Sequence, residues 1–181
     1  QEMIEGFKNF IKTTPKLPIL TKKQKETLPS LNIKVGMNQE QMKELLQKAR
    51  LENPVADLAF YAFRDMENIS WQPFFKAAFE RNPVSLLGLK DQTPKQAYQT
   101  LKEFKEESIY PQKRLAQPDE VWNFKRGDGV EKAILLASYL KFLQPTIPIQ
   151  LKIAPHHVSL IWQEYRFDFS SLKELSYQGN F

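Results

Sequence analysis

One stretch of the sequence decides the fold: Lys125-Arg126-Gly127-Asp128-Gly129-Val130-Glu131-Lys132-Ala133-Ile134-Leu135-Leu136-Ala137-Ser138-Tyr139-Leu140. A polar turn, Gly127-Asp128-Gly129, leads directly into a long apolar segment. Apolar residues recur there at helical spacing, at positions 130, 133, 134, 137 and 140. Leu135, Leu136 and Tyr139 widen this face, so we expect a helix that is covered on most of its sides.

The start of such a helix has a distinct chemistry. Its first backbone N–H groups have no partner within the helix, and they carry a partial positive charge. This charge lowers the pKa of a thiol and so favours a thiolate nucleophile. The sequence has Gly129 at this position, and it has no cysteine at all. Disulfides, thiolate metal sites and a cysteine nucleophile are therefore excluded.

The stretch resembles the nucleophile motif of the transglutaminase-like superfamily, a group of cysteine enzymes with papain-like architecture. Bacterial members carry a Gly-Asp-Cys turn, then one or two acidic residues, a Lys, an Ala and a Leu-rich helix. Gly127 and Asp128 match the turn, Glu131-Lys132-Ala133 match the residues after it, and the apolar run 134–140 matches the helix. Gly129 stands where the family has its catalytic Cys.

Other segments extend the resemblance over about the C-terminal third of the chain. The segment 117–122 is similar to the short helical turn that the family places before its motif. His157-Val158-Ser159-Leu160 is similar to the His-bearing strand, and Tyr165-Arg166-Phe167-Asp168 is similar to the strand that ends on the Asp. The resemblance therefore implies a triad in which His157 and Asp168 are present and the nucleophile is missing.

Capping signals and helical periodicity predict a helical N-terminal part. Asn38 with Gln41, and Thr93 with Gln96, have the spacing of capping boxes, in which each side chain bonds a backbone N–H group of the other residue. The run 84–89 is too short to assign. We predict helices over 1–12, 38–49, 55–66 and 71–81, and a further helix from Thr93 onwards.

Alternating apolar and polar residues predict strands after the central helix. We expect these strands at 147–153, 157–162 and 165–169, with Gln163-Glu164 as a hairpin turn. The polar tail, 170–181, is expected to lie on the surface. The fold class is therefore α+β: a helical N-terminal extension, 1–92, and a transglutaminase-like core, 93–181, in which the central helix packs on an antiparallel sheet.

Composition and charge narrow the function classes. The net charge of +5 is the sole feature that favours a nucleic-acid or anionic-surface partner. The charge comes mostly from scattered Lys residues, so a nucleic-acid partner is not expected. No apolar run reaches the length of a membrane span. His156 and His157 are adjacent on a strand and point to opposite faces, so we predict neither a metal site nor a cofactor. The sequence begins with Gln1 and not with Met, so we expect a chain that is either processed or trimmed. The sequence does not predict a compartment; a removed signal would make the protein secreted, periplasmic or lipid-anchored.

The missing nucleophile directs the functional prediction. Removing the nucleophile of a catalytic triad costs on the order of a millionfold in rate. We therefore expect an inactive domain that binds a protein or an extended peptide in a groove lined by Trp122, Asp128, Gly129 and His157. The alternative is a thiol-dependent transglutaminase or peptidase whose Cys was replaced at Gly129. Without a nucleophile, we expect His157 to hydrogen-bond Asp168 and to pack under the central helix.

Overall fold

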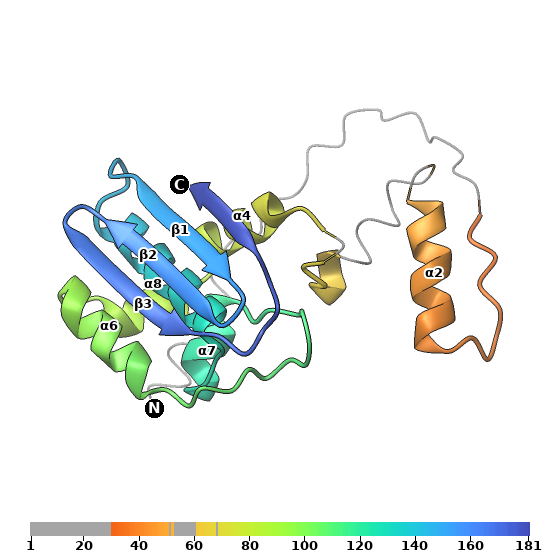
Figure 1. Ribbon diagram of the computed structural model, residues 1–181, viewed down its shortest axis with the longest axis horizontal. Coiled ribbons are helices and arrows are strands. Elements are labelled where there is room, and N and C mark those ends of the chain that lie inside the picture. The colour runs from red at the N-terminus through yellow and green to blue at the C-terminus, as the bar shows by residue number, and fades with distance from the viewer. Residues whose placement is uncertain (1–29, 51, 53–60, 68) are drawn as a thin grey trace, which may run out of the picture. The chain divides into compact units, whose positions relative to one another are not determined.

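A four-stranded antiparallel sheet lies over one long helix in the computed structural model, which describes residues 30–50, 52, 61–67 and 69–181. The strand order is β3-β2-β1-β4, and Figure 1 shows the sheet in front with helix α8, Gly129–Leu143, behind it. The strands are β1 (Ile149–Ala154), β2 (His157–Trp162), β3 (Tyr165–Ser170) and β4 (Tyr177–Asn180). The α+β class predicted from the sequence is therefore confirmed.

Helix α8 is the centre of the core. Every residue from Gly129 to Leu140 is buried, as the wide apolar face predicted. The helix packs against β1, β2 and β3 on one side and against four shorter helices on the others. These helices are α4 (Trp71–Glu80), α5 (Pro83–Leu89), α6 (Pro94–Glu103) and α7 (Pro118–Phe124).

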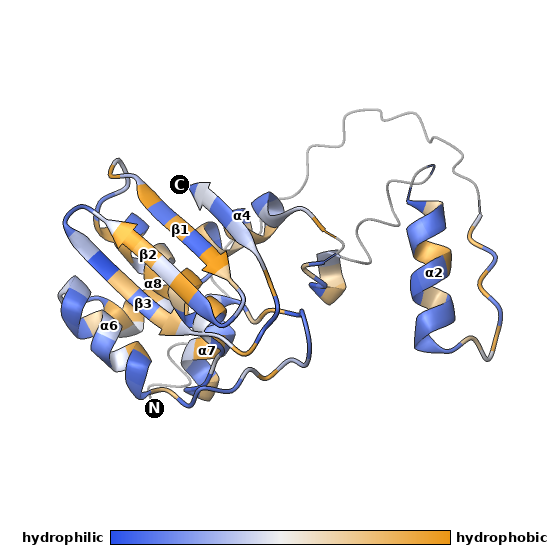
Figure 2. Cartoon of the chain, in the orientation of Figure 1, coloured by the Kyte–Doolittle hydropathy of each residue, from blue (hydrophilic) through white to orange (hydrophobic). Residues whose placement is uncertain are grey.

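The sheet has one buried and one exposed face. Side chains alternate along each strand, so residues two apart share a face. Val158, Leu160, Phe167 and Phe169 are buried against the helices. The polar residues between them lie on the opposite face, and the alternation is visible as orange and blue bands along the strands in Figure 2.

Most predicted elements within the described residues are present. Helix α2 spans Gln39–Ala49, and the capping boxes at Asn38 and Thr93 both form. The predicted helix 71–81 is α4, and the unassigned run 84–89 lies in α5. The predicted helix 1–12 and the first half of the predicted helix 55–66, residues 55–60, lie outside the described residues.

The prediction that the tail, 170–181, lies on the surface is wrong. Residues Tyr177–Asn180 form β4 and pair with β1, while Ser171, Lys173 and Leu175 are buried. Gly179 and Asn180 are poor strand formers, so pairing with β1 and aromatic packing override local propensity here. The aromatic contacts include Tyr177 and Phe181 against Phe75, with ring centroids 5.0 Å and 4.4 Å apart.

The predicted boundary between residues 92 and 93 runs through this core. Leu31–Phe181 cluster as one compact unit, and Phe74, Phe75 and Ala78 of α4 are buried with the residues of α8. No helix in the described ranges is long and apolar enough to cross a membrane.

Shortening a side chain in the centre of α8 should destabilise the fold strongly. Leu136 is fully buried, so Leu136→Ala is expected to lower the free energy of unfolding by about 2–5 kcal/mol through lost burial and a residual cavity. Leu87 of α5 is 72% exposed, so Leu87→Ala is the matched control and should change stability by less than about 1 kcal/mol. Urea denaturation of both variants measures the difference; equal losses would contradict the central position of α8.

Candidate functional site

Asp128 caps α8 and fixes the loop after β3. Its Oδ1 accepts hydrogen bonds from the Val130 N–H at 2.9 Å and from the Ser171 hydroxyl at 2.7 Å. Its Oδ2 accepts from the Leu172 N–H at 2.7 Å. The carboxylate is almost fully buried, so these donors replace the water that it loses on folding. Asp128 is therefore the N-cap of α8, and it also holds residues 171 and 172.

Glu131 completes the capping box and ties down a second loop. Its Oε2 accepts from the Asp128 N–H at 2.8 Å, while Oε1 accepts from the Ser108 hydroxyl at 2.6 Å and the Ala116 N–H at 2.7 Å. The side chain has no exposed surface. Burial raises the pKa of Glu131, and the hydrogen bonds only partly offset this effect.

Two buried lysines bind backbone carbonyls near the carboxylates. Lys173 Nζ donates to the carbonyls of Tyr110, Gln112 and Arg114 at 3.0, 3.0 and 2.6 Å. Lys132 Nζ donates to the Phe104 carbonyl at 2.6 Å. Burial lowers the pKa of both lysines. Each cation thus fixes a loop around the start of α8.

Gly129 packs directly against the end of β3. A Cβ atom at this position would overlap the carbonyl oxygen of Ser170, and it would lie 2.7 Å from the Ser170 carbonyl carbon and 3.0 Å from the Phe169 Cβ. Real Cβ atoms do not make such contacts with backbone. Only glycine fits here while Ser170 keeps its position, so β3 fills the place where a nucleophile side chain would project.

His157 and Asp168 do meet, but on the far side of the sheet. His157 Nε2 lies 3.1 Å from Asp168 Oδ1, so the predicted pair is confirmed. The expected packing under the helix is wrong, because the His157 side chain is 52% exposed and shares the open face with Asp168. Arg166 Nε donates to the same carboxylate at 3.0 and 3.2 Å, so the Arg166 guanidinium is a further partner of Asp168.

The four predicted groove residues do not line a common cavity. Asp128 and Gly129 are buried, whereas His157 lies on the open face of the sheet. Trp122 is half-buried: its ring lies 5.6 Å from the Phe104 ring, and Lys125 Nζ lies 3.2 Å above its centroid.

A polar cluster that sequence reasoning missed joins α7 to the segment before α4. Arg64 bonds both oxygens of Glu120 and donates to the Tyr110 hydroxyl at 2.7 Å, and that hydroxyl donates to Glu120 at 2.7 Å. Burial alone would raise the pKa of Glu120, but the bonds from Arg64, Gln117 and Tyr110 outweigh it and lower this pKa. The partners are far apart in sequence, so no local pattern could show this cluster.

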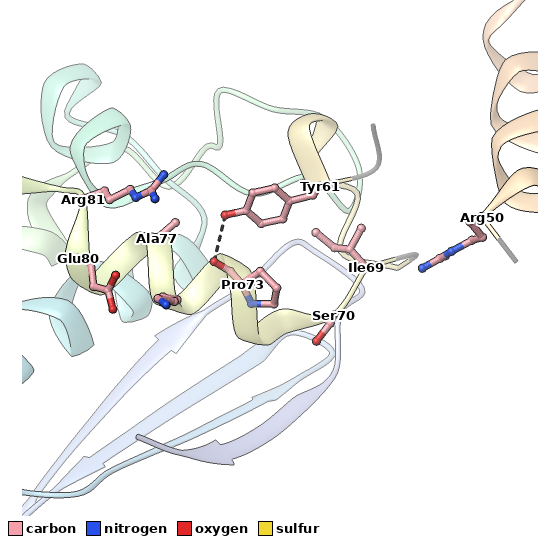
Figure 3. Close-up of a pocket in the computed structure, with 9 residues that line it drawn as sticks. Arg50, Tyr61, Ile69, Ser70, Pro73, Ala77, Glu80 and Arg81 are labelled. Atoms are coloured by element: carbon pink, nitrogen blue, oxygen red, sulfur yellow. Dashed lines mark hydrogen bonds between the residues drawn. The ribbon is translucent and has the colours of Figure 1, made fainter. Parts of the chain in front are cut away.

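A groove follows the outer side of α4 and is drawn in Figure 3. Pro73 and Ala77 form part of its lining, and Tyr61 donates its hydroxyl hydrogen to the Pro73 carbonyl at 3.0 Å. Glu80 and Arg81 bring opposite charges to its rim, and the hollow measures about 460 Å³. No pattern in the sequence indicates this groove. Among the described residues, its lining has neither paired carboxylates nor a nucleophile with a base.

The described part of the chain contains no cluster of side chains that could bind a metal ion. No group of three or more His, Asp or Glu side chains lies close enough to hold an ion there. Asp168 is held by Arg166 and His157, and Asp128 and Glu131 are held by N–H and O–H donors.

Comparisons with known proteins leave the family open. No protein-family model, curated protein or solved structure matches the chain. The likeness to the transglutaminase-like superfamily therefore stays a prediction from the sequence segments that carry it.

Glu131 should impose a pH dependence on stability. Its pKa is raised above 4.5 in the folded state, so the unfolded chain releases this proton first as pH rises. The contribution of Glu131 to stability is therefore present below about pH 4.5 and is lost as pH rises through the folded pKa. Glu131→Gln removes this titration and costs about 1–3 kcal/mol at low pH, because an amide cannot accept all three bonds.

The measurement is the difference in unfolding free energy between wild type and Glu131→Gln from about pH 4, near the usual pKa of a Glu carboxyl, up to about pH 8. We expect the advantage of the wild type to shrink as pH rises. The exposed Glu103→Gln serves as the control for exchanging a Glu for a Gln. A wild-type advantage that grows with pH would contradict the raised pKa.

Lys173 should contribute more to the stability of the fold than its position in a loop suggests. Lys173→Met keeps the aliphatic stem but leaves three carbonyls without their donor, so we expect a loss of about 2–4 kcal/mol. Lys152→Met, on the exposed sheet face, is the control and should be nearly neutral. Thermal or urea unfolding compares the two; a neutral Lys173→Met would mean that water replaces the ammonium group.

Proposed function

We propose that the chain is a non-catalytic domain with a transglutaminase-like core, and that it binds an extended peptide segment of another protein. The observation that carries the proposal is the contact of Gly129 with Ser170, because it leaves no room for a nucleophile at the start of α8. The capping carboxylate of Asp128 occupies the N–H group of Val130 there. The helix start therefore offers a substrate oxygen neither a nucleophile nor an open cradle of donors.

The position of His157 supports the same conclusion. A general base must lie within hydrogen-bond reach of the group that it deprotonates. His157 lies on the open face of the sheet and contacts Asp168, whereas Gly129 is buried beside the end of β3. An enzyme silenced by one substitution at residue 129 would keep the other groups aimed at that position.

The surface favours a peptide or protein over a nucleic acid. On the open sheet face, Lys152 and Arg166 are the cations, and Arg166 is already paired with Asp168. Phosphate recognition requires clustered unpaired cations, usually with exposed aromatic residues. The described exposed face instead consists mainly of amide, hydroxyl and aliphatic groups, which suit contacts with a polypeptide.

A substitution at Gly129 tests the non-catalytic part of the proposal. Ala normally stabilises a helix relative to Gly, but Gly129→Ala should lower the unfolding free energy by about 1–3 kcal/mol because β3 must move. Gly127→Ala is the matched control, since a Cβ there meets the end of the Val121 side chain at 3.0 Å. Urea denaturation measures both variants; a stabilised Gly129→Ala would contradict the tight contact.

Gly129→Cys separates the pseudoenzyme from the enzyme alternative. We expect the folded variant to react slowly with a chloroacetyl peptide, and to react equally slowly when His157→Ala is added. Mass spectrometry measures the labelling. Fast labelling of the folded protein that depends on His157 would support the enzyme alternative and overturn the proposal.

The binding part is tested by selecting from a displayed library of random linear peptides on the folded chain. We expect enrichment of peptides whose binding is lost when the chain is unfolded by heat. If no peptide is enriched, the chain is not a peptide-binding domain and this part of the proposal is wrong.

A further inference from the structure

The two edge strands of the sheet, β3 and β4, differ in how their outer sides are covered. The free edge of β3 is covered and charged. Tyr98 of α6 donates its hydroxyl hydrogen to the Asp168 carbonyl at 2.7 Å, and the Ser170 carbonyl lies against Gly129. Arg166 and Asp168 add charges along this strand. Covering helices and charges are common means by which proteins prevent further strand pairing.

The free edge of β4 lacks these features. Phe181 and Ile149 exchange two backbone hydrogen bonds, of 3.0 and 2.9 Å, and hydrogen-bonded pairs alternate along an antiparallel ladder. The backbone groups of Gln178 and Asn180 therefore point away from β1. Both residues are exposed, and neither makes an outward backbone hydrogen bond with any described residue. Figure 1 shows β4 as the last strand on its side of the sheet.

The side chains of this edge carry no charge. Tyr177, Gln178, Gly179, Asn180 and Phe181 include neither Lys nor Pro, the residues that most often protect an edge. The ladder is therefore open to another extended chain.

An aromatic surface lies beneath the same edge. The Tyr177 ring lies 5.0 Å from the Trp71 ring and 5.0 Å from the Phe75 ring, and the Phe181 ring lies 5.2 Å from the Phe79 ring. Phe75 is buried, but Trp71, Tyr177 and Phe181 are only partly covered. A strand added beside β4 would direct every second side chain toward this aromatic face.

We propose that the free edge of β4 binds an extended peptide as a fifth strand, with Gln178 and Asn180 supplying the backbone hydrogen bonds. This inference rests on the proposed peptide-binding function and identifies its site. The peptide alternates apolar residues, which face Trp71 and Tyr177, with uncharged polar residues, which face the side of Gln178 and Asn180. Strand addition of this kind takes its affinity from main-chain bonds and its specificity from alternate side chains.

A second copy of the chain fits the edge less well than a peptide. Pairing of two β4 strands would join only a four-residue edge, about 13 Å long. Stable dimers bury about 800 Å² on each partner, far more than such an edge supplies. A peptide needs no such area, because it can follow the edge and contact the aromatic face at the same time.

The experiment uses the enriched peptide and two variants of one residue. Gln178→Pro removes an outward N–H group but leaves the β1 side of the ladder intact, and Gln178→Thr is the matched control that keeps this N–H. We expect the peptide to bind Gln178→Pro at least about tenfold more weakly than wild type, and to bind Gln178→Thr within about twofold. Amide hydrogen exchange of the wild-type chain should slow at Gln178 and Asn180 when the peptide is added.

The outcomes separate the two proposals. If enriched peptides bind Gln178→Pro as tightly as wild type and leave both amides unprotected, the edge is not the site, while peptide binding itself stands. If the two amides exchange slowly in the free chain at every concentration, the chain's own residues cover the edge and the inference is wrong. Protection that appears only at high protein concentration would assign the edge to a second copy and would also overturn it.

Discussion

The carboxylates of Asp128 and Glu131 set the constraint on which the rest of the structure depends. A carboxylate removed from water is costly unless donors replace its hydration. The donors here come from Ser108 and Ala116 before α8 and from Ser171 and Leu172 after β3. The helix start and both loops can therefore form only together. Lys173 reinforces this coupling, since it reaches from one loop to carbonyls of the other.

The same residues carry the resemblance to the cysteine enzymes, and each has an architectural role. Asp128 caps the helix, Glu131 and Lys132 anchor neighbouring segments, and the Gly127 N–H donates to the Lys105 carbonyl at 3.0 Å. The motif thus encodes a buried helix start that is tied to the surrounding loops. In an enzyme, this helix start must also stay open to a substrate. Here Asp128 and the end of β3 close it. Under the proposed function, the motif is kept for its architectural role and not for catalysis.

Local signals in the sequence predicted most of the fold, and contacts between distant segments account for the rest. Capping boxes at Asn38 and Thr93 and the alternation in β2 and β3 are local, so the sequence alone indicates them. The apolar residues Val158 and Leu160 lie on the face of the strand opposite to His157, so the expected packing of His157 under the helix conflicted with this alternation. The contact of Gly129 with Ser170 and the pairing of β4 join segments far apart in sequence, so periodicity could not show them.

The polar groups at the open edge of β4 are satisfied in a different way from those in the core. Within the described residues, Trp162 Nε1 is the single buried side-chain polar atom without a partner, so the core satisfies its polar groups almost completely. The outward groups of Gln178 and Asn180 are exposed and can bond water at no cost. A partner strand that replaces this water gains only about 1 kcal/mol for each hydrogen bond, and association itself costs several times more. Backbone pairing alone is therefore too weak for recognition, and burial of side chains on the aromatic face beside Trp71 has to supply the remaining free energy.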